Sequence, residues 1–167
     1  MPTEPTTVLA LQAVIALLQE VTGSPTYHYD LSGSGTVYLG ENIVDANHSP
    51  ASVAVGPASV GTADSLNGIS YTGRSMRIYI YATIPGDAND YETRLFSLWR
   101  LSDDIANALS PSAIRDKVSS LAAGRGPGIT NITLDQGIAT GANNSPLGRL
   151  AMQLQLTFTR LLTGGGV

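Results

Sequence analysis

The sequence predicts an α+β domain whose mainly antiparallel sheet carries an N-terminal helix and a central helical pair packed on one face. Segments 74–83 and 148–161 alternate apolar and polar residues with the period of two that a half-buried strand shows. Segments 6–23, 87–109 and 110–124 instead repeat apolar residues at helical spacing. Because strands and helices do not alternate along the chain, a doubly wound parallel sheet is not expected.

The N-terminal helix is expected in TTVLALQAVIALLQEVTG, which spans residues 6–23. Thr6 or Thr7 can cap its first turn, and Gly23 can adopt the left-handed conformation that ends a helix. The apolar surface is wider than one sheet would cover, because the main polar residues are Gln12, Gln19 and Glu20. Such a helix is either buried on two sides within the domain or completes its burial against another subunit.

Short strands are expected next in YHYDL (27–31), TVYLG (36–40) and ASVAVG (51–56), which are bounded by turn residues. Residues 57–68 are expected to form a loop. A long strand then follows in RSMRIYIYAT (74–83), with one apolar face. The other face of this strand carries Arg77, Tyr79, Tyr81 and Thr83.

The central helical pair is expected in two consecutive segments. The N-terminal caps available to the first helix are Asp87, Asn89 and Asp90. This helix is expected to end near Leu109, and its expected buried side comprises Leu95, Leu98, Trp99, Ile105 and Leu109. In the second helix, Ser110 is the expected cap, Pro111 the first helical residue and Gly124 the stop. The residues expected to face inward from it are Ile114, Val118 and Leu121.

Two strands are expected to close the domain: NITLDQGIATG (131–141), with a break at Gly137, and GRLAMQLQLTFTRL (148–161). The last strand has an apolar face and a face of uncharged polar side chains between Arg149 and Arg160. We expect the polar faces of the two long strands to meet another subunit, through Arg77, Tyr79, Tyr81, Gln153, Gln155, Thr157 and Arg160. The alternative is a solvent-facing sheet that cross-strand pairs stabilise.

The composition indicates one domain without covalent cross-links. Residues 1–167 are expected to form a single unit, with a flexible Gly-rich tail at 162–167. The absence of cysteine excludes disulfides, thiolate metal sites and cysteine nucleophiles. The apolar run from Val8 to Leu18 is too short to span a membrane, and no basic segment precedes it. We therefore expect a soluble protein of a cytoplasm.

Charge is sparse and unevenly distributed along the sequence. The 9 basic residues all lie from Arg74 onward, whereas six of the 13 acidic residues precede it. A net charge of -4 without a basic cluster is a poor match for binding phosphate backbones. Opposite charges can attract copies of one subunit to each other, or they can be scattered over a monomer. Asp103 and Asp104 are expected on a solvated helix face beside Arg100.

No motif of an enzyme or a cofactor site is found, so no catalytic, cofactor-binding or metal-binding residue is expected. His28 and Asp30 would share a face of an expected strand, which would let the carboxylate orient the imidazole. No nucleophile motif lies nearby, and neither His28 nor His48 has the spacing of a metal site. The Gly-rich stretches 32–35 and 124–128 lack the motifs of phosphate-binding and dinucleotide-binding loops.

An ordered set of segments extends over most of the chain. After an apolar N-terminal helix it comprises GSPTYHYDL, TVYLG, ASVAVG, MRIYIYAT, YETRLFSLWRLSDDIANAL and LAMQLQLTFTRL. In size, element order and pattern, this set resembles the tail terminator (tail completion) proteins of long-tailed bacteriophages. The helix at 110–123 and the loop at 57–68 are additions to that pattern.

The resemblance implies a structural virion protein without enzymatic activity or a cofactor. Such proteins form a homo-oligomeric ring, usually a hexamer, that caps the tail tube, stops its polymerisation and joins it to the head or neck. The implied partners are the tail tube protein and a head-completion or neck protein, and DNA passes through the ring without specific binding. With such a ring, the polar faces of the two long strands are expected either to meet another subunit or to border the DNA passage. The implied location is the tail or neck of the virion, after assembly in the cytoplasm of the host bacterium.

Two alternatives stay open. Another phage neck or tail tube subunit would show the same pattern of elements but would polymerise into long tubes. A small hydrolase or ligand-binding α+β domain would instead depend on His28 and Asp30. Loss of an activity on mutation of these two residues would favour the second alternative.

Overall fold

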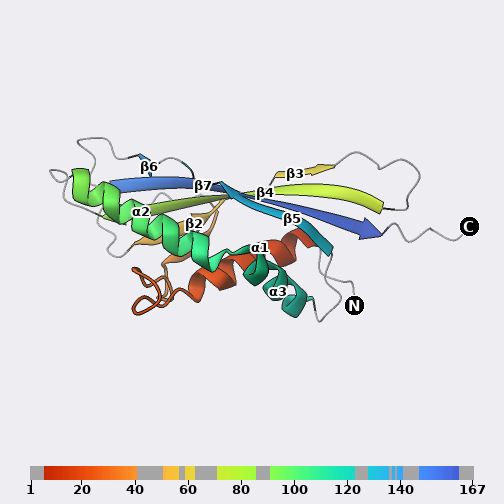
Figure 1. The fold of residues 1–167 in the computed structure, drawn as a ribbon, viewed down its shortest axis with the longest axis horizontal. Coiled ribbons are helices and arrows are strands. Elements are labelled where there is room, and N and C mark those ends of the chain that lie inside the picture. Colours follow the sequence, from red (N-terminus) through yellow and green to blue (C-terminus); the bar gives the residue numbers. More distant parts are fainter. Residues whose placement is uncertain are drawn as a thin grey trace, which may run out of the picture.

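The computed structural model describes residues 6–40, 51–56, 59–62, 71–85, 91–122, 128–135, 137, 139–140 and 147–161. Three helices and seven strands follow one another along these parts of the chain (Figure 1). In chain order they are α1 (Thr6–Gln19), β1 (Val37–Leu39), β2 (Ser52–Val55), β3 (Ser59–Thr62), β4 (Tyr71–Pro85), α2 (Tyr91–Ala108), α3 (Pro111–Leu121), β5 (Gly128–Asp135), β6 (Ala139–Thr140) and β7 (Leu147–Leu161).

The sheet is organised around the pairing of β4 with β7. These two strands, each of 15 residues, run antiparallel in unbroken register from Tyr71 opposite Leu161 to Pro85 opposite Leu147. β2 and β3 pair with the edge of β4 that lies away from β7, whereas β5 and β6 pair with the edge of β7 that lies away from β4. β1 joins β2 in parallel at one edge. The sheet is therefore mixed, and the predicted α+β fold with a mainly antiparallel sheet is confirmed.

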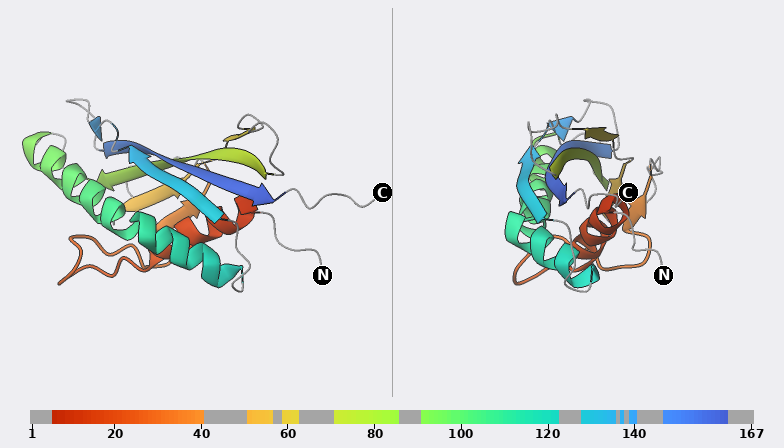
Figure 2. Two further views of the ribbon diagram at one scale, coloured as in Figure 1. Left: turned by 45° about the vertical axis from the view of Figure 1, so that its right-hand side comes forward. Right: turned by 90° about the vertical axis from the view of Figure 1, so that its right-hand side faces the viewer.

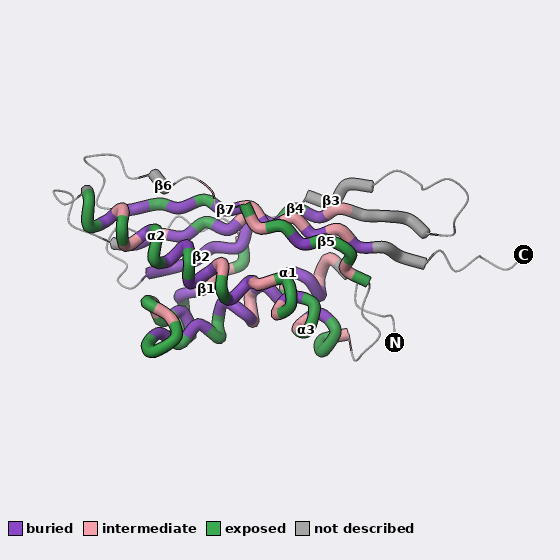
Figure 3. Tube along the Cα trace, viewed as in Figure 1, coloured by how far each residue is buried: buried purple, intermediate pink, exposed green. Residues whose placement is uncertain are grey.

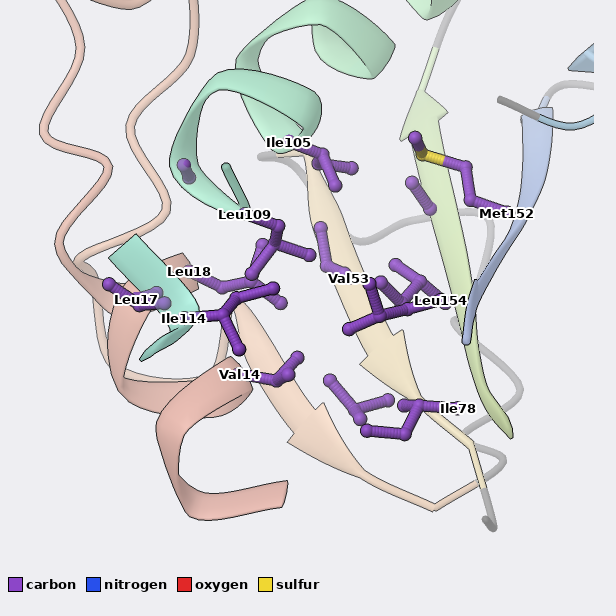
Figure 4. Close-up of a cluster of buried hydrophobic side chains, with 14 of the residues drawn as sticks. Val14, Leu17, Leu18, Val53, Ile78, Ile105, Leu109, Ile114, Met152 and Leu154 are labelled. Carbon is purple, nitrogen blue, oxygen red and sulfur yellow. The ribbon is translucent and has the colours of Figure 1, made fainter. Parts of the chain in front are cut away.

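The three helices lie on one face of the curved sheet, as the end-on view in Figure 2 shows. The strands turn their apolar side chains toward these helices, and the buried positions follow the period of two along β4 and β7 (Figure 3). Figure 4 shows side chains of the helices pointing into this layer toward Val53, Ile78 and Leu154. The buried residues of the two long strands are Met76, Ile78, Ile80, Ala82, Ile84, Leu150, Met152, Leu154, Leu156 and Phe158.

The wide apolar surface of α1 is buried on more than one side within the domain. Val14 and Leu18 are completely buried, whereas Leu11 and Ile15 are partly buried and pack against the same core. α1 contacts α3, α2 and β1. Of the two expectations for this helix, burial within the domain and burial against another subunit, the first describes it. Its expected polar residues, Gln12, Gln19 and Glu20, are exposed.

Two expectations about strands are wrong. Residues 27–31 do not form a strand, although Asp30 forms an isolated bridge with Thr22. The backbone N–H groups of His28 and Tyr29 donate instead to the Asp104 carboxylate on α2, at 2.8 Å and 2.9 Å. Residues 59–62 lie in the expected loop but form β3, which pairs antiparallel with residues 74–77 of β4.

Asp104 on α2 is buried, although it was expected on a solvated helix face. Its side chain is buried and binds two successive backbone N–H groups of the segment before β1, whereas the adjacent Asp103 is exposed. A carboxylate can satisfy such donors without a strand partner. Asp104 therefore attaches the segment around residue 28 to α2.

The side of α2 that faces the core also differs from the expectation. Trp99 was expected to be buried but is 42% exposed, whereas Leu101 is completely buried together with Leu98 and Ile105. α2 lies close to the start of β7, because a Cβ added at Gly148 would lie 3.0 Å from Leu98 Cδ1 and from Arg94 Cγ. The stripe at 98, 101 and 105 therefore turns Trp99, one residue further round the helix, toward solvent.

α3 begins as expected. The side chain of Ser110 accepts a hydrogen bond from the Ala113 N–H, and Pro111 opens the helix. Ile114 and Val118 are buried, but Leu121, at the end of the helix, is 42% exposed and not inward-facing.

The break expected at Gly137 lies between β5 and β6, where an added Cβ would come 1.7 Å from the Ala151 carbonyl oxygen of β7. A glycine therefore permits this close approach. Several expectations fall outside the described residues, namely those for Asp87, Asn89, Asp90, His48, Gly124 and the tail at 162–167.

The Asp104 attachment yields a stability prediction. Replacement of Asp104 by Ala leaves the N–H groups of His28 and Tyr29 without their acceptor, so the free energy of unfolding should fall by about 2–3 kcal/mol. Chemical denaturation measures this loss. Asp103→Ala is the matched control on the exposed side, and it should change the free energy by less than about 0.5 kcal/mol. Equal effects of the two variants would contradict the attachment.

Candidate functional site

The face of the sheet that points away from the helices gathers most of the residues predicted to form an interface. In the β4–β7 register, Arg77 lies opposite Gln155 and Tyr79 opposite Gln153. Directly paired residues project on the same side of an antiparallel sheet. We call this side the outer face, and its members on the three central strands are Ser75, Arg77, Tyr79, Tyr81, Thr83, Arg149, Ala151, Gln153, Gln155, Thr157, Asn131, Thr133 and Asp135.

A pair of tyrosines occupies the β4 side of the outer face. The rings of Tyr79 and Tyr81 are stacked, with centroids 6.5 Å apart and an interplanar angle of 19°. Gly56, just after β2, lies against both residues, since an added Cβ would come 3.1 Å from Tyr81 Cε2 and 3.3 Å from Tyr79 Cβ. The Gly56 N–H also donates to the Tyr79 carbonyl oxygen at 2.6 Å. The lack of a side chain at this position thus gives the tyrosines room to stack.

The outer face is partly buried along its centre and exposed at its charges. Gln153, Gln155 and Thr157 are half-buried, whereas Arg77 and Arg149 are exposed. None of the three described helices covers this face (Figure 1). Tyrosine and arginine are enriched in protein interfaces, and the glutamine and threonine side chains between them carry no charge that burial would have to desolvate.

Arg160 is the one predicted residue that the register separates from the others. Its position lies opposite Thr72, in phase with Leu156 and Phe158, whose side chains face the helices. The alternation of β7 therefore does not bring position 160 to the outer face.

The pair of His28 and Asp30 does not form the arrangement that general acid–base chemistry would use. The Asp30 carboxylate accepts hydrogen bonds from Ser32, from its N–H at 2.9 Å and its hydroxyl at 2.6 Å. These hydrogen bonds, first that of the hydroxyl, hold the pKa of Asp30 below its usual range. His28 is exposed, and its backbone N–H is bound to Asp104. The Asp30 carboxylate thus stabilises a local turn.

Within the described ranges, no three or more His, Asp or Glu side chains are grouped so that they could hold a metal ion. None of the helices in these ranges is long and apolar enough to cross a membrane.

A second exposed surface, on α2, was not predicted. Phe96 and Trp99 are 55% and 42% exposed, and the neighbouring charged residues on the same side of the helix are also exposed. We call this surface the α2 ridge, and its members are Glu92, Phe96, Trp99, Arg100 and Asp103. Their spacing of three and four residues places them along one line of the helix. The same spacing was visible in the sequence, but Trp99 was assigned to the buried side.

Comparisons with known proteins add no family to this description. The sequence matches no protein-family model and no curated protein. The functional argument therefore depends on the two exposed surfaces of the domain, the outer face and the α2 ridge.

The separation of the two sheet faces can be tested by neighbouring substitutions on β7. Gln155→Glu places a carboxylate opposite Arg77 on the outer face, so the free energy of unfolding should change by less than about 0.5 kcal/mol. Leu154→Ala, one residue earlier, removes a completely buried side chain and should cost about 2–5 kcal/mol. Chemical denaturation compares the two variants. A large loss for Gln155→Glu would show that the outer face supports the fold.

Proposed function

We propose that this protein is a structural subunit of a bacteriophage virion that assembles into a hexameric ring. The ring caps the tail tube, stops its polymerisation and joins it to the head or neck, and the subunit has no enzymatic role. The observation that supports this proposal best is the presence of two unlike exposed surfaces on one domain, the outer face and the α2 ridge. The sequence resemblance supplies the identity of the assembly.

Two unlike surfaces are what a closed ring requires of its subunit. In a ring each copy contacts its two neighbours through different patches, and the rotation between copies decides whether the assembly closes. The sheet lies between the two surfaces, since the outer face points away from the helices and the ridge lies on a helix of the other layer (Figure 2). One contact repeated around an axis can therefore use both surfaces of every copy.

The charges of the protein fit a ring through which DNA passes. The protein carries a net charge of -4, with 9 Lys and Arg residues against 13 Asp and Glu residues. Tight binding to DNA depends on neutralising many phosphates with Lys and Arg side chains. A lumen without such a cluster lets DNA move. The partners of the ring are the tail tube protein below and the neck or head-completion protein above.

A tail tube or neck subunit is the second candidate, because the same observation supports it. A contact between unlike patches that does not close by rotation produces an open helical filament. Long tubes formed by the purified protein would favour this candidate. Rings that bind to the ends of tubes and limit their length would favour the tail terminator.

Negative-stain electron microscopy and sedimentation of the purified protein test the proposal. We expect rings with a central hole and a mass of six subunits, and we expect added rings to stop the growth of tail tubes in vitro. Gln155→Glu should prevent ring formation while the protein stays folded, because the new charge lies on the outer face. Ser119→Glu, an exposed polar residue of α3, is the matched control and should leave rings intact. A monomer at every concentration would contradict the proposal.

A further inference from the structure

The α2 ridge exposes more apolar area than a solvated helix face needs. Phe96 and Trp99 lie three residues apart on the exposed side of α2, and an acidic residue lies beyond each end of this aromatic pair, namely Glu92 and Asp103. Eleven residues of helix separate the two carboxylates, which corresponds to about 16 Å. Adjacent exposed aromatics with a charged rim are typical of a surface that another protein covers.

The outer face carries the complementary pattern. Arg77 and Arg149 are both exposed, and Arg149 lies opposite Thr83, six residues along β4 from Arg77. The two arginines are therefore about 20 Å apart along the strand direction. The stacked pair of Tyr79 and Tyr81 lies between them. Each surface thus places two aromatic side chains between two like charges, which are carboxylates on the ridge and guanidinium groups on the outer face. The ridge also carries Arg100 beside Trp99, and the outer face also carries Asp135.

We infer that the α2 ridge of one copy docks onto the outer face of the next copy. The inference depends on the proposed ring and names the surfaces that hold it together. Phe96 and Trp99 pack against the tyrosine pair and its glutamine neighbours, while Glu92 and Asp103 lie near the two arginines. Arginine beside an aromatic ring adds a cation–π attraction.

The outer face of a second copy fits the ridge better than the ridge of a second copy does. The ridge carries two carboxylates and one arginine, whereas the central strands of the outer face carry two arginines and Asp135. Ridge against outer face therefore joins opposite net charges. Contacts between two ridges, or between two outer faces, would join equal net charges and be disfavoured. A contact of unlike surfaces is also the kind that builds a ring.

Cysteine cross-linking tests which surfaces meet, because the natural chain has no cysteine. A mixture of Phe96→Cys and Gln153→Cys proteins should give a cross-linked dimer with a short bifunctional thiol reagent, whereas neither protein alone should. A chain with both substitutions should give a ladder that ends at the number of subunits in the ring. Leu121→Cys, at an exposed apolar residue of α3, replaces Phe96→Cys as the control and should not cross-link to Gln153→Cys.

Charge reversal tests the complementarity independently. A ridge variant with Glu92→Arg and Asp103→Arg should lose rings, and so should a face variant with Arg77→Glu and Arg149→Glu. An equimolar mixture of the two variants should restore rings, because every contact then joins opposite charges in an alternating ring. Asp116→Arg, on the exposed side of α3, is the control that should leave rings intact. Circular dichroism checks that each variant is folded.

The outcomes separate this inference from the proposed function. Rings that persist in both charge variants, or a cross-link of either single cysteine protein to itself, would overturn the docking and leave the ring proposal standing. Long filaments that depend on both surfaces would support the docking and contradict a closed ring. A natural protein that stays monomeric at every concentration would overturn both.

Discussion

The antiparallel pairing of β4 with β7 is the constraint on which the other features of the structure depend. Side chains alternate between the two faces of a strand, so a shift of one residue would move every apolar side chain to the opposite face. Burial of Ile78 and Leu154 beneath the helices excludes such a shift. The same register places Arg77 beside Gln155 on the outer face. The packing of the buried face thus also fixes the arrangement of side chains on the outer face.

The position of the α2 ridge depends on the packing of α2 against that sheet. Gly148 lets α2 approach β7 closely, because any side chain there would meet Leu98 and Arg94. Asp104, on the buried side of α2, holds the segment that leads into β1. These contacts orient α2 with Leu98 and Asp104 toward the rest of the domain, and Phe96 and Trp99 remain exposed. The ridge and the outer face are therefore fixed relative to each other, as a repeated contact between copies requires.

The sequence predicted the features that depend on local periodicity. The alternation in β4 and β7 gave both strands and both faces, and Ser110 with Pro111 gave the start of α3. Features that depend on distant partners were missed. Residues 27–31 have the composition of a strand, but the N–H groups of His28 and Tyr29 bind a carboxylate that lies about 75 positions further along the chain. The parallel pairing of β1 with β2 is likewise invisible to local patterns.

The candidate site was predicted in the same way, and only in part. The outer-face residues of β4 and β7 followed from alternation, whereas the α2 ridge required knowledge of which helical stripe faces the core. Trp99 lies about 100° round the helix from Leu98, so a pattern of apolar residues fits either stripe. The burial of Leu101 decides between them.

Sparse charge agrees with the proposed assembly of this protein. Charged residues make up 13% of the sequence, against about 25% in typical soluble domains. Charges keep exposed surfaces apart, and each charge at an interface must be desolvated or paired when copies associate. An outer face of tyrosines, glutamines and threonines loses little on burial, and its two arginines can be paired by the two carboxylates of the ridge. The composition therefore agrees with surfaces that meet other copies of the chain.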